Sequence, residues 1–427
     1  MFSDDSFMKT ITIIRKNKIL KGKLRLPPSK SISNRLLVIR ALSNTDFSIN
    51  NLSHSDDTIL LQKLLHEIRN SKSVKSYIEL DTANAGTAMR FLTSYLTFLP
   101  GKWILTGSDR MKQRPIGILV DALKALGADI DYLGKLGYPP LMIKGKSLKG
   151  GEITVDPGIS SQFISALLLV APRLPGGLSI RFQGQAVSFP YIHMTLRLLE
   201  FFNVETLQKR NNIVIPEADI IGRDFTVEAD WSAAAFWYEA AILADEVDLV
   251  LEGLQKNSLQ GDAILADIYQ NFGIVSEFNI NGVRLTKTKK KMDGYYFDFS
   301  DHPDIALAVI TTCAALGIRG RFEGLKSLRI KETNRLRALK IEYSKLGLNL
   351  EPDSPVELIP KIEFVNPQLK SNPDLKIETY GDHRMAMTFA PLAIKFGSIR
   401  IENPDVVSKS YPEYWDHLAS LGFEIKY

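Results

Sequence analysis

The chain has 427 residues, of which 45% are apolar and 24% are charged, the proportions of an ordinary globular protein. These proportions exclude a disordered, collagen-like or disulfide-rich chain. Lysine and arginine together number 53, against 48 acidic residues, and the resulting charge of +5 is too dilute to indicate nucleic-acid binding. A mild positive charge of this kind does suit a site for small anions.

Residues 1–10 are polar and acidic and do not resemble a signal peptide, and the longest apolar runs are too short to span a bilayer. We therefore expect a cytoplasmic protein without membrane contact. The single cysteine, Cys313, excludes internal disulfides and cysteine-based zinc sites, and no HExxH motif is present. We expect no metal and no cofactor.

Taken in chain order, six apolar helices are predicted, each opened by a polar segment. The segments are SKSISNR (29–35), NAGTAMR (84–90), SSQF (160–163), ADWSAAAF (229–236), HPDIAL (302–307) and GDHRMAM (381–387). The helices that follow are apolar around most of their circumference, which predicts that they are buried.

An amphipathic helix follows each apolar one and leads through a turn into an alternating strand. Five of these turns are centred on Gly127, Asn203, Gly273, Gly347 and Gly422, at spacings of 70 to 76 residues. Gly or Asn at such places is typical of a left-handed helix C-terminus. A sixth copy, near Arg69, lacks the glycine. The spacing predicts six copies of one β–α–β–α–β-type unit.

Six such units exceed what one core accommodates, so we expect an α/β (α+β) protein of two lobes, each of three units, with a cleft between them. One lobe is predicted at 28–228 and the other at 1–27 plus 229–427, because the opening strand at 10–15 is expected to join the C-terminal units. A single large α/β domain is the alternative.

Fixed positive charges lie at or near the predicted helix starts. They are Lys30, Arg35, Arg114, Lys331, Arg335, Arg384 and Lys409, accompanied by Ser31, Thr87, Ser160, Ser161, Gln162 and Ser188. Helix N-termini and guanidinium groups both bind phosphate and carboxylate, so the pattern predicts ligands with more than one such group. Helix capping and ordinary surface charge are the alternative interpretation. GxxxxGK[ST] and GxGxxG are absent, which argues against a P-loop or a dinucleotide site.

Three carboxylates at helix starts are candidates for proton transfer: Asp304, Glu332 and Asp382, the last followed by His383. A carboxylate in such a position more often caps the helix than reacts. The basic stretch KTKKK at 287–291 is interpreted as a solvated hairpin tip.

Eight segments together resemble the signature sequences of the 5-enolpyruvylshikimate-3-phosphate (EPSP) synthases, in family order and over nearly the whole chain. They are LPPSKSISNRLL, NAGTAMRFL, RMKQRPIGILVDAL, SSQFISALLL, VSFPYI, RIKETNRL, YGDHRMAM and SKSYPEYW. The resemblance implies two lobes of three βαβαββ units that close about a hinged cleft. It also implies a monomeric transferase that moves the enolpyruvyl group of phosphoenolpyruvate to the 5-hydroxyl of shikimate 3-phosphate, in aromatic amino acid biosynthesis.

The resemblance also assigns residues. For shikimate 3-phosphate they are Lys30, Ser31, Arg35, Ser160, Ser161, Gln162, Ser188, Tyr191, Asp304 and Lys331. For phosphoenolpyruvate they are Lys30, Asn84, Gly86, Thr87, Arg114, Gln162, Arg335, Arg384 and Lys409. Asp304 is implied as the base for the 5-hydroxyl and Glu332 as the acid for the methylene carbon, with Lys30 beside it.

Several positions depart from the usual family pattern: Pro28, Phe91, Phe189, Ser327 and Asn334. They put substrate affinity in question more than the reaction. One rival reading is the sister enolpyruvyl transferase that acts on UDP-N-acetylglucosamine, which uses a loop cysteine. Cys313, inside an apolar helix, instead predicts a buried structural thiol. The second rival is a non-catalytic anion-binding relative of the same repeat fold.

Overall fold

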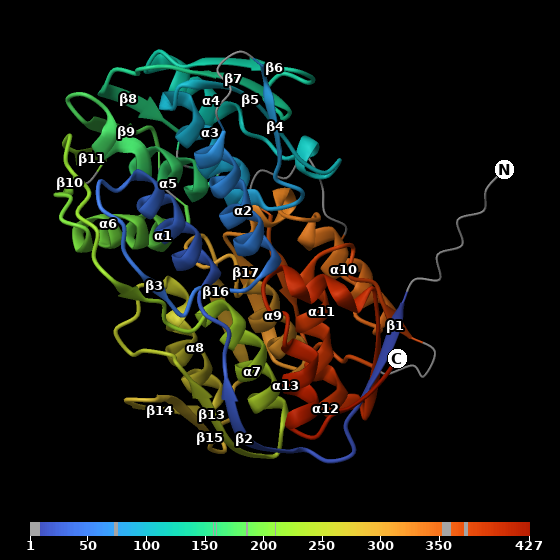
Figure 1. The fold of residues 1–427 in the computed structure, drawn as a ribbon. Coiled ribbons are helices and arrows are strands. Elements are labelled where there is room, and N and C mark those ends of the chain that lie inside the picture. The colour runs from blue at the N-terminus through green and yellow to red at the C-terminus, as the bar shows by residue number, and fades with distance from the viewer. Residues whose placement is uncertain are drawn as a thin grey trace. The chain divides into compact units, whose positions relative to one another are not determined.

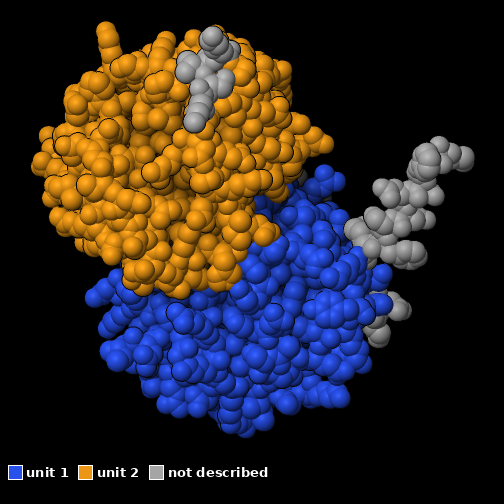
Figure 2. Space-filling model, in the orientation of Figure 1, with its two compact units in different colours: residues 1–27, 228–258, 262–427 blue, residues 28–227, 259–261 orange. Residues whose placement is uncertain are grey.

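The computed structural model describes residues 9–71, 76–156, 158, 160–184, 187–209, 211–351, 360–370 and 375–427. Helices and strands alternate along this part of the chain, which confirms the α/β class (Figure 1). The chain forms two compact units (Figure 2). Unit 1 comprises Met1–Pro27, Glu228–Ser258 and Asp262–Tyr427, and unit 2 comprises Pro28–Val227 and Leu259–Gly261. That these units are lobes of three repeats on either side of a cleft stays a prediction.

Unit 2 is built around three buried helices that pack on one another. They are α1 (Lys30–Leu42), α3 (Gly86–Phe98) and α5 (Ser161–Val170). The more amphipathic helices are α2 (Asp56–Asn70), α4 (Gly117–Ala125) and α6 (Phe189–Phe201). All six polar segments predicted from the sequence lie at helix starts, and three of them begin α1, α3 and α5.

The described strands of unit 2 form three sheets. The first has the order β4 (Ile78–Asp81), β5 (Gly101–Thr106), β7 (Leu141–Gly145) and β6 (Asp129–Tyr132). The second has the order β8 (Gly151–Val155), β9 (Leu178–Phe182), β11 (Asn212–Ile215) and β10 (Leu207–Lys209). The third pairs β3 (Ile49–Asn50) with β12 (Phe225–Thr226).

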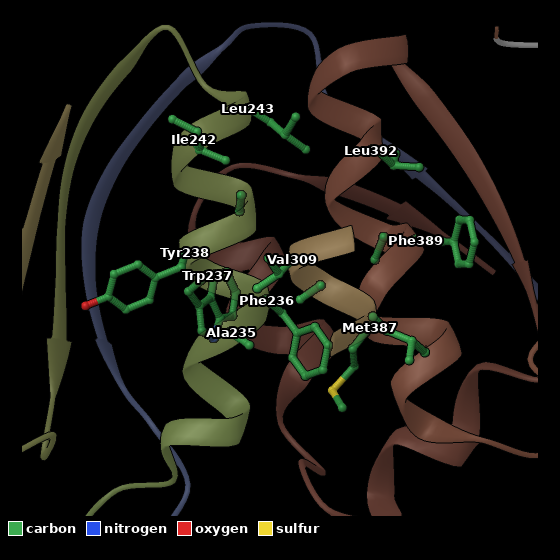
Figure 3. Packing of buried hydrophobic residues seen from close by; sticks show 14 of the residues in the cluster. Ala235, Phe236, Trp237, Tyr238, Ile242, Leu243, Val309, Met387, Phe389 and Leu392 are labelled. Atoms are coloured by element: carbon green, nitrogen blue, oxygen red, sulfur yellow. The ribbon is translucent and has the colours of Figure 1, made fainter. Parts of the chain in front are cut away.

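Unit 1 repeats this plan. Its buried helices are α7 (Trp231–Leu243), α9 (Ala306–Leu316) and α11 (His383–Phe389). Its other helices are α8 (Leu265–Phe272), α10 (Arg335–Lys345), α12 (Ala393–Phe396) and α13 (Tyr414–Ser420). In α7, twelve of thirteen residues are buried, and Figure 3 shows Phe236 of α7 beside Val309 of α9 and Met387 of α11.

The described strands of unit 1 also form three sheets. The first has the order β2 (Ile19–Arg25), β13 (Glu246–Glu252), β15 (Gly282–Lys287) and β14 (Ile274–Asn279). The second has the order β16 (Gly294–Asp298), β17 (Arg319–Glu323) and β18 (Ile362–Phe364). The third has the order β19 (Lys376–Ile377), β20 (Ser398–Glu402), β1 (Thr10–Ile14) and β21 (Glu424–Lys426). The opening strand β1 thus pairs with C-terminal strands.

Strand directions reveal the same repeat. Each four-stranded sheet begins with a parallel pair and continues with two antiparallel pairs, as in β4–β5, β5–β7 and β7–β6. The two strands of the parallel pair lie on either side of a buried helix, because parallel neighbours need a crossover. Among the antiparallel pairs, β6–β7, β10–β11 and β14–β15 join consecutive strands, whereas a helix and a strand separate β5 from β7. The sheet ending in β21 shows this pattern even though its third strand, β1, comes from the other end of the chain.

The five predicted turn positions adopt left-handed backbone conformations. Their φ angles are 94° at Gly127, 67° at Asn203, 104° at Gly273, 80° at Gly347 and 87° at Gly422. This confirms that the glycine or asparagine ends the preceding helix. In the sixth copy, which lacks the glycine, α2 is followed by an extended residue, Ser71, with φ of −68°.

Two predictions about single residues have opposite outcomes. Cys313 is fully buried in α9, so it is confirmed as a structural thiol. The solvated hairpin tip at 287–291 is wrong for Lys287, which is the last residue of β15. Its Nζ donates to the carbonyl oxygens of Ile242 and Ala244, at 2.6 Å each. The reason is that the last carbonyls of α7 lack helical partners and need donors from elsewhere. No helix in the described part of the chain is long and apolar enough to cross a membrane.

Candidate active site

Arg335 is the centre of a charge cluster in unit 1. It is the first residue of α10 and only 1% of it is exposed. Asn334 caps this helix by accepting a hydrogen bond from the Arg337 backbone N–H at 3.1 Å. Asn334, one of the positions that depart from the usual pattern, is therefore a functional N-terminal cap.

Three carboxylates surround the Arg335 guanidinium. Its Nε and Nη2 bind the two carboxylate oxygens of Asp382 at 2.7 and 3.2 Å. Nη2 also binds Glu332 Oε2 at 2.9 Å, and Nη1 binds Asp304 Oδ1 at 3.3 Å. Burial on its own would lower the pKa of Arg335, but Asp382, Glu332 and Asp304 together raise it above its usual value. The cation is permanent, and it fixes the positions of all three acids.

Asp304 is held by three cations. Its Oδ1 lies 3.4 Å from Lys331 Nζ, and its Oδ2 lies 3.5 Å from Arg384 Nη2, in addition to the Arg335 contact. Arg384 Nη1 also donates to the Asp304 carbonyl oxygen at 2.5 Å. Burial lowers the pKa of Lys331, and Asp304 opposes that shift. Because α9 has Ile305 as its N-cap residue, Asp304 lies before the cap position.

Glu332 lies between two cations, Arg335 at 2.9 Å and Lys409 Nζ at 3.8 Å from its Oε1. Asp382 behaves differently from the other two acids, because it is the N-cap of α11 and accepts from the Arg384 N–H at 2.9 Å. The capping interpretation is thus right for Asp382, while Asp304 and Glu332 occupy other positions. The cluster has four cations and three carboxylates.

A second group of predicted residues gathers in unit 2, where α1 packs against α5 and α6. Arg35 Nε donates to Thr195 Oγ1 at 2.8 Å, and its Nη2 donates to Ser165 Oγ at 3.0 Å. Its Nη1 donates to the Ser31 carbonyl oxygen at 2.9 Å. Burial lowers the pKa of Arg35 to about 10, with Tyr191 opposing the shift, so the side chain stays charged at neutral pH.

Hydroxyl groups line the starts of α5 and α6. Ser160 is the N-cap of α5, and its Oγ accepts from the Gln162 N–H at 3.3 Å, with Ser161 as the first helical residue. Ser188 is the N-cap of α6 and has a φ of 55°. A left-handed serine is uncommon, and such strain is concentrated at functional sites.

Arg114 lies against the start of α3. It is 5% exposed, and its Nε and Nη1 have no hydrogen-bond partner among the described residues. Its guanidinium lies so close to Gly86 that a β-carbon there would be 2.8 Å from Nη1. Thr87 follows Gly86 in the first turn, and Asn84 precedes it. A buried cation with unused donors beside a helix N-terminus is an arrangement that binds anions.

The sequence did not identify three of the residues that hold this group. Thr195 and Ser165 fix Arg35, and Asp57 Oδ2 lies 3.1 Å from Lys30 Nζ. Polar residues inside the otherwise apolar stretch ISALLLV were the only available signal for Ser165. The described residues hold no group of three His, Cys, Asp or Glu arranged to bind a metal.

Comparisons with known proteins agree over almost the full length. The family model for EPSP synthase (3-phosphoshikimate 1-carboxyvinyltransferase) matches residues 14–418. A 3-phosphoshikimate 1-carboxyvinyltransferase of Bacteroides fragilis is 46% identical over 408 residues, covering 95% of this chain and 97% of that protein. One from Vibrio campbellii is 36% identical over 435 residues, covering 97% and 100%. The solved EPSP synthase of Acinetobacter baumannii is similar in fold, with a TM-score of 0.75, 23% identity and coverage of 98% and 100%.

These comparisons define the class: an α/β enzyme that acts on small molecules. Within that class, the chain belongs to the EPSP synthase family and is a transferase.

Proposed function

We propose that this chain transfers the enolpyruvyl group of phosphoenolpyruvate to the 5-hydroxyl of shikimate 3-phosphate and releases phosphate. The observation that carries the proposal is the charge cluster of unit 1, which holds two non-capping carboxylates, Asp304 and Glu332, among fixed cations. The addition of an alcohol to an enol phosphate needs a proton removed from oxygen and a proton delivered to carbon. Two separate carboxyl groups, one acting as base and the other as acid, supply both.

In the addition step, Asp304 takes the proton of the 5-hydroxyl as that oxygen bonds to C2 of phosphoenolpyruvate, and Glu332 protonates C3. In the elimination step, C3 returns a proton and the bond from C2 to the phosphate oxygen breaks, which restores the double bond and releases phosphate. Arg335, Arg384 and Lys409 are already fixed by ion pairs, so they stabilise the carboxylate and phosphate of the intermediate without rearranging.

Unit 2 is proposed to bind the shikimate phosphate and part of phosphoenolpyruvate. The serines lie at the N-termini of α5 and α6, where hydroxyl groups and backbone N–H groups can bind a phosphate or a ring hydroxyl. Arg35 adds a guanidinium to this group. Arg114 suits the second anion, since it is the buried arginine with unused donors described above. We further propose a cytoplasmic monomer, and the molar mass of the purified protein by light scattering tests the monomer.

Phosphate release tests the activity and separates the rival readings. Release with phosphoenolpyruvate plus shikimate 3-phosphate supports the proposal, and release with UDP-N-acetylglucosamine as the only effective acceptor overturns it. No turnover with either acceptor would favour the anion-binding relative. Cys313 already argues against the sister transferase, because it is buried in α9 and burial raises the pKa of its thiol, whereas that enzyme needs a reactive loop cysteine.

One substitution, with a matched control, tests the proton-transfer role of Glu332. Glu332→Gln keeps the shape of the side chain and removes its acid, so we expect shikimate 3-phosphate to bind while kcat falls by about 100-fold or more. Glu363→Gln, at an exposed acid of β18, is the matched control and should leave kcat unchanged. Near-normal turnover of Glu332→Gln would remove the proposed role.

Arg384→Ala tests the assignment of the ligands. Because Arg384 is assigned to phosphoenolpyruvate, the KM for phosphoenolpyruvate should rise far more than the KM for shikimate 3-phosphate. An equal rise in both constants would show that the assignment is wrong.

A further inference from the structure

Unit 2 contains a cavity that none of the proposed substrate contacts uses. Its volume is about 1040 Å³, and it lies among the C-terminal halves of α1 and α3, the exposed helix α2 and the strand β5. The other substrate residues of α1 and α3 lie at the N-terminal ends of those helices. Arg35 lies in the middle of α1, but its guanidinium binds Thr195 and Ser165, which do not line the cavity.

One wall of this cavity is apolar and aromatic. Leu37, Ile68, Tyr95 and Trp103 line it, and each is less than a tenth exposed. The Trp103 indole Nε1 is buried and has no hydrogen-bond partner among the described residues. Less than 1 Å² of this nitrogen is accessible, so the indole contributes apolar surface to the wall and does not offer its N–H to the cavity.

The rim of the cavity is positively charged. Arg40, Lys63, His66 and Arg69 line it together with a single acid, Asp46. Lys63 has Glu67 as a partner at 3.8 Å. Within the described part of the chain, Arg40 and Arg69 form no ion pair. They lie in the last turns of α1 and α2, where a cation suits the helix dipole, but both charges remain available to an anion.

Arg69 also acts on the aromatic wall. Burial raises the pKa of Tyr95, and the positive charge of Arg69 opposes that shift. Both residues line the cavity. A flat apolar body between aromatic side chains with an anionic group at its edge matches these walls.

We propose that this cavity is a binding site for an aromatic monoanion, such as an aryl carboxylate. Its ring lies against the wall formed by Tyr95 and Trp103, and its carboxylate pairs with Arg40 and Arg69. Since the cavity is separate from the substrate residues, the aromatic anion binds together with the substrates rather than in place of them.

The probe for this site is 2-naphthoate, titrated into the full-length protein by calorimetry and tryptophan fluorescence. Trp103 is the one tryptophan of unit 2, because the other three, at 231, 237 and 415, belong to unit 1. We expect saturable binding that quenches part of the fluorescence, and loss of that quenching in Trp103→Phe. Neutral 2-naphthylmethanol, which has the ring without the charge, should bind about ten-fold more weakly.

Two arginine variants test the proposed binding of 2-naphthoate independently of whether Trp103→Phe folds. Arg40→Gln and Arg69→Gln each change a surface-accessible side chain and should weaken 2-naphthoate about ten-fold. Arg197→Gln, at an exposed arginine of α6 paired with Glu200, is the matched control and should bind normally. The proposal is overturned if 2-naphthoate does not bind, if both arginine variants bind it as the wild type does, or if saturating shikimate 3-phosphate and phosphoenolpyruvate displace it.

Discussion

Arg335 and Asp382 form a two-point ion pair, with 2.7 Å between Nε and Oδ2 and 3.2 Å between Nη2 and Oδ1, and 1% or less of each side chain is exposed. The pair joins the start of α10 to the start of α11. Because Asp382 also accepts the Arg384 backbone N–H, it fixes two of the cations that are proposed to bind phosphoenolpyruvate. It is a positioning residue for that site.

Removing one charge of this pair should destabilise the protein markedly. Asp382→Asn leaves Arg335 buried with only its two weaker carboxylate partners, so we expect the free energy of unfolding to fall by about 3 kcal/mol. Glu323→Gln breaks the solvent-screened pair with Arg321, so it should lower the free energy of unfolding far less. Urea unfolding of both variants makes the comparison, and losses of equal size would contradict the argument.

The buried carboxyl group of Glu239 should make the free energy of unfolding depend on pH. It is fully buried in α7, and neither of its carboxylate oxygens has a hydrogen-bond partner among the described residues. Burial raises its pKa well above 4.5. In the unfolded chain the carboxyl ionises near its ordinary value, whereas the folded protein keeps it protonated. Stability from this group is therefore complete below pH 4.5 and is lost as the pH rises toward the folded pKa.

Glu239→Gln should remove that dependence. Above pH 4.5 and below the folded pKa, each pH unit costs the wild type about 1.4 kcal/mol, so the melting temperature of the variant should rise relative to that of the wild type as the pH increases above 4.5. Thermal unfolding over this range is the measurement, with the exposed Glu277→Gln as control. Parallel curves for wild type and Glu239→Gln would show that the carboxyl is already ionised in the folded protein.

The features that the sequence predicted correctly are local ones. A serine, asparagine or aspartate before an apolar run and a glycine after an amphipathic one act within a single turn, so their patterns identify helix ends directly. Asp304 and Asp382 show the limit of such patterns. Both precede apolar helices, but only Asp382 is the N-cap, and the difference depends on a turn that places Ile305 at the cap of α9.

Contacts between distant segments could not be predicted from the sequence, because its patterns identify only features that form within a single turn. Thr195 and Ser165 hold Arg35 because α1, α5 and α6 pack together, and no spacing along the chain encodes that contact. Lys287 was misjudged because its environment is set by the end of α7, more than 40 residues earlier.

Gly86→Ala should weaken phosphoenolpyruvate selectively. The new β-carbon would lie 2.8 Å from two nitrogens of Arg114, so the guanidinium must move away from the position proposed to bind phosphoenolpyruvate. We expect the KM for phosphoenolpyruvate to rise about ten-fold, and the KM for shikimate 3-phosphate to change little. Gly134→Ala, where the nearest atom is 3.7 Å away, is the control. An unchanged KM for phosphoenolpyruvate in steady-state assays would separate Arg114 from that substrate.

Phe91, which replaces the family's usual proline, is predicted to orient Arg35. The Arg35 guanidinium carbon lies 5.5 Å from the centre of the Phe91 ring and 6.0 Å from that of Tyr191. Both distances are within the range of a cation–π interaction, which is strongest where water is excluded. Phe91→Leu removes the ring while keeping an apolar side chain, so it leaves Arg35 held by its hydrogen bonds and by the more distant Tyr191 ring.

The expected result is a specific effect on one substrate. In Phe91→Leu the KM for shikimate 3-phosphate should rise about three-fold with kcat nearly constant, because the orientation of Arg35 is loosened and the acids of unit 1 are unchanged. Phe91→Tyr keeps an aromatic face toward Arg35 and should retain the wild-type KM. If both variants raise the two substrate KM values equally, Phe91 acts through packing of α3 and not through Arg35. If neither changes them, the hydrogen bonds to Thr195, Ser165 and Ser31 orient the arginine on their own.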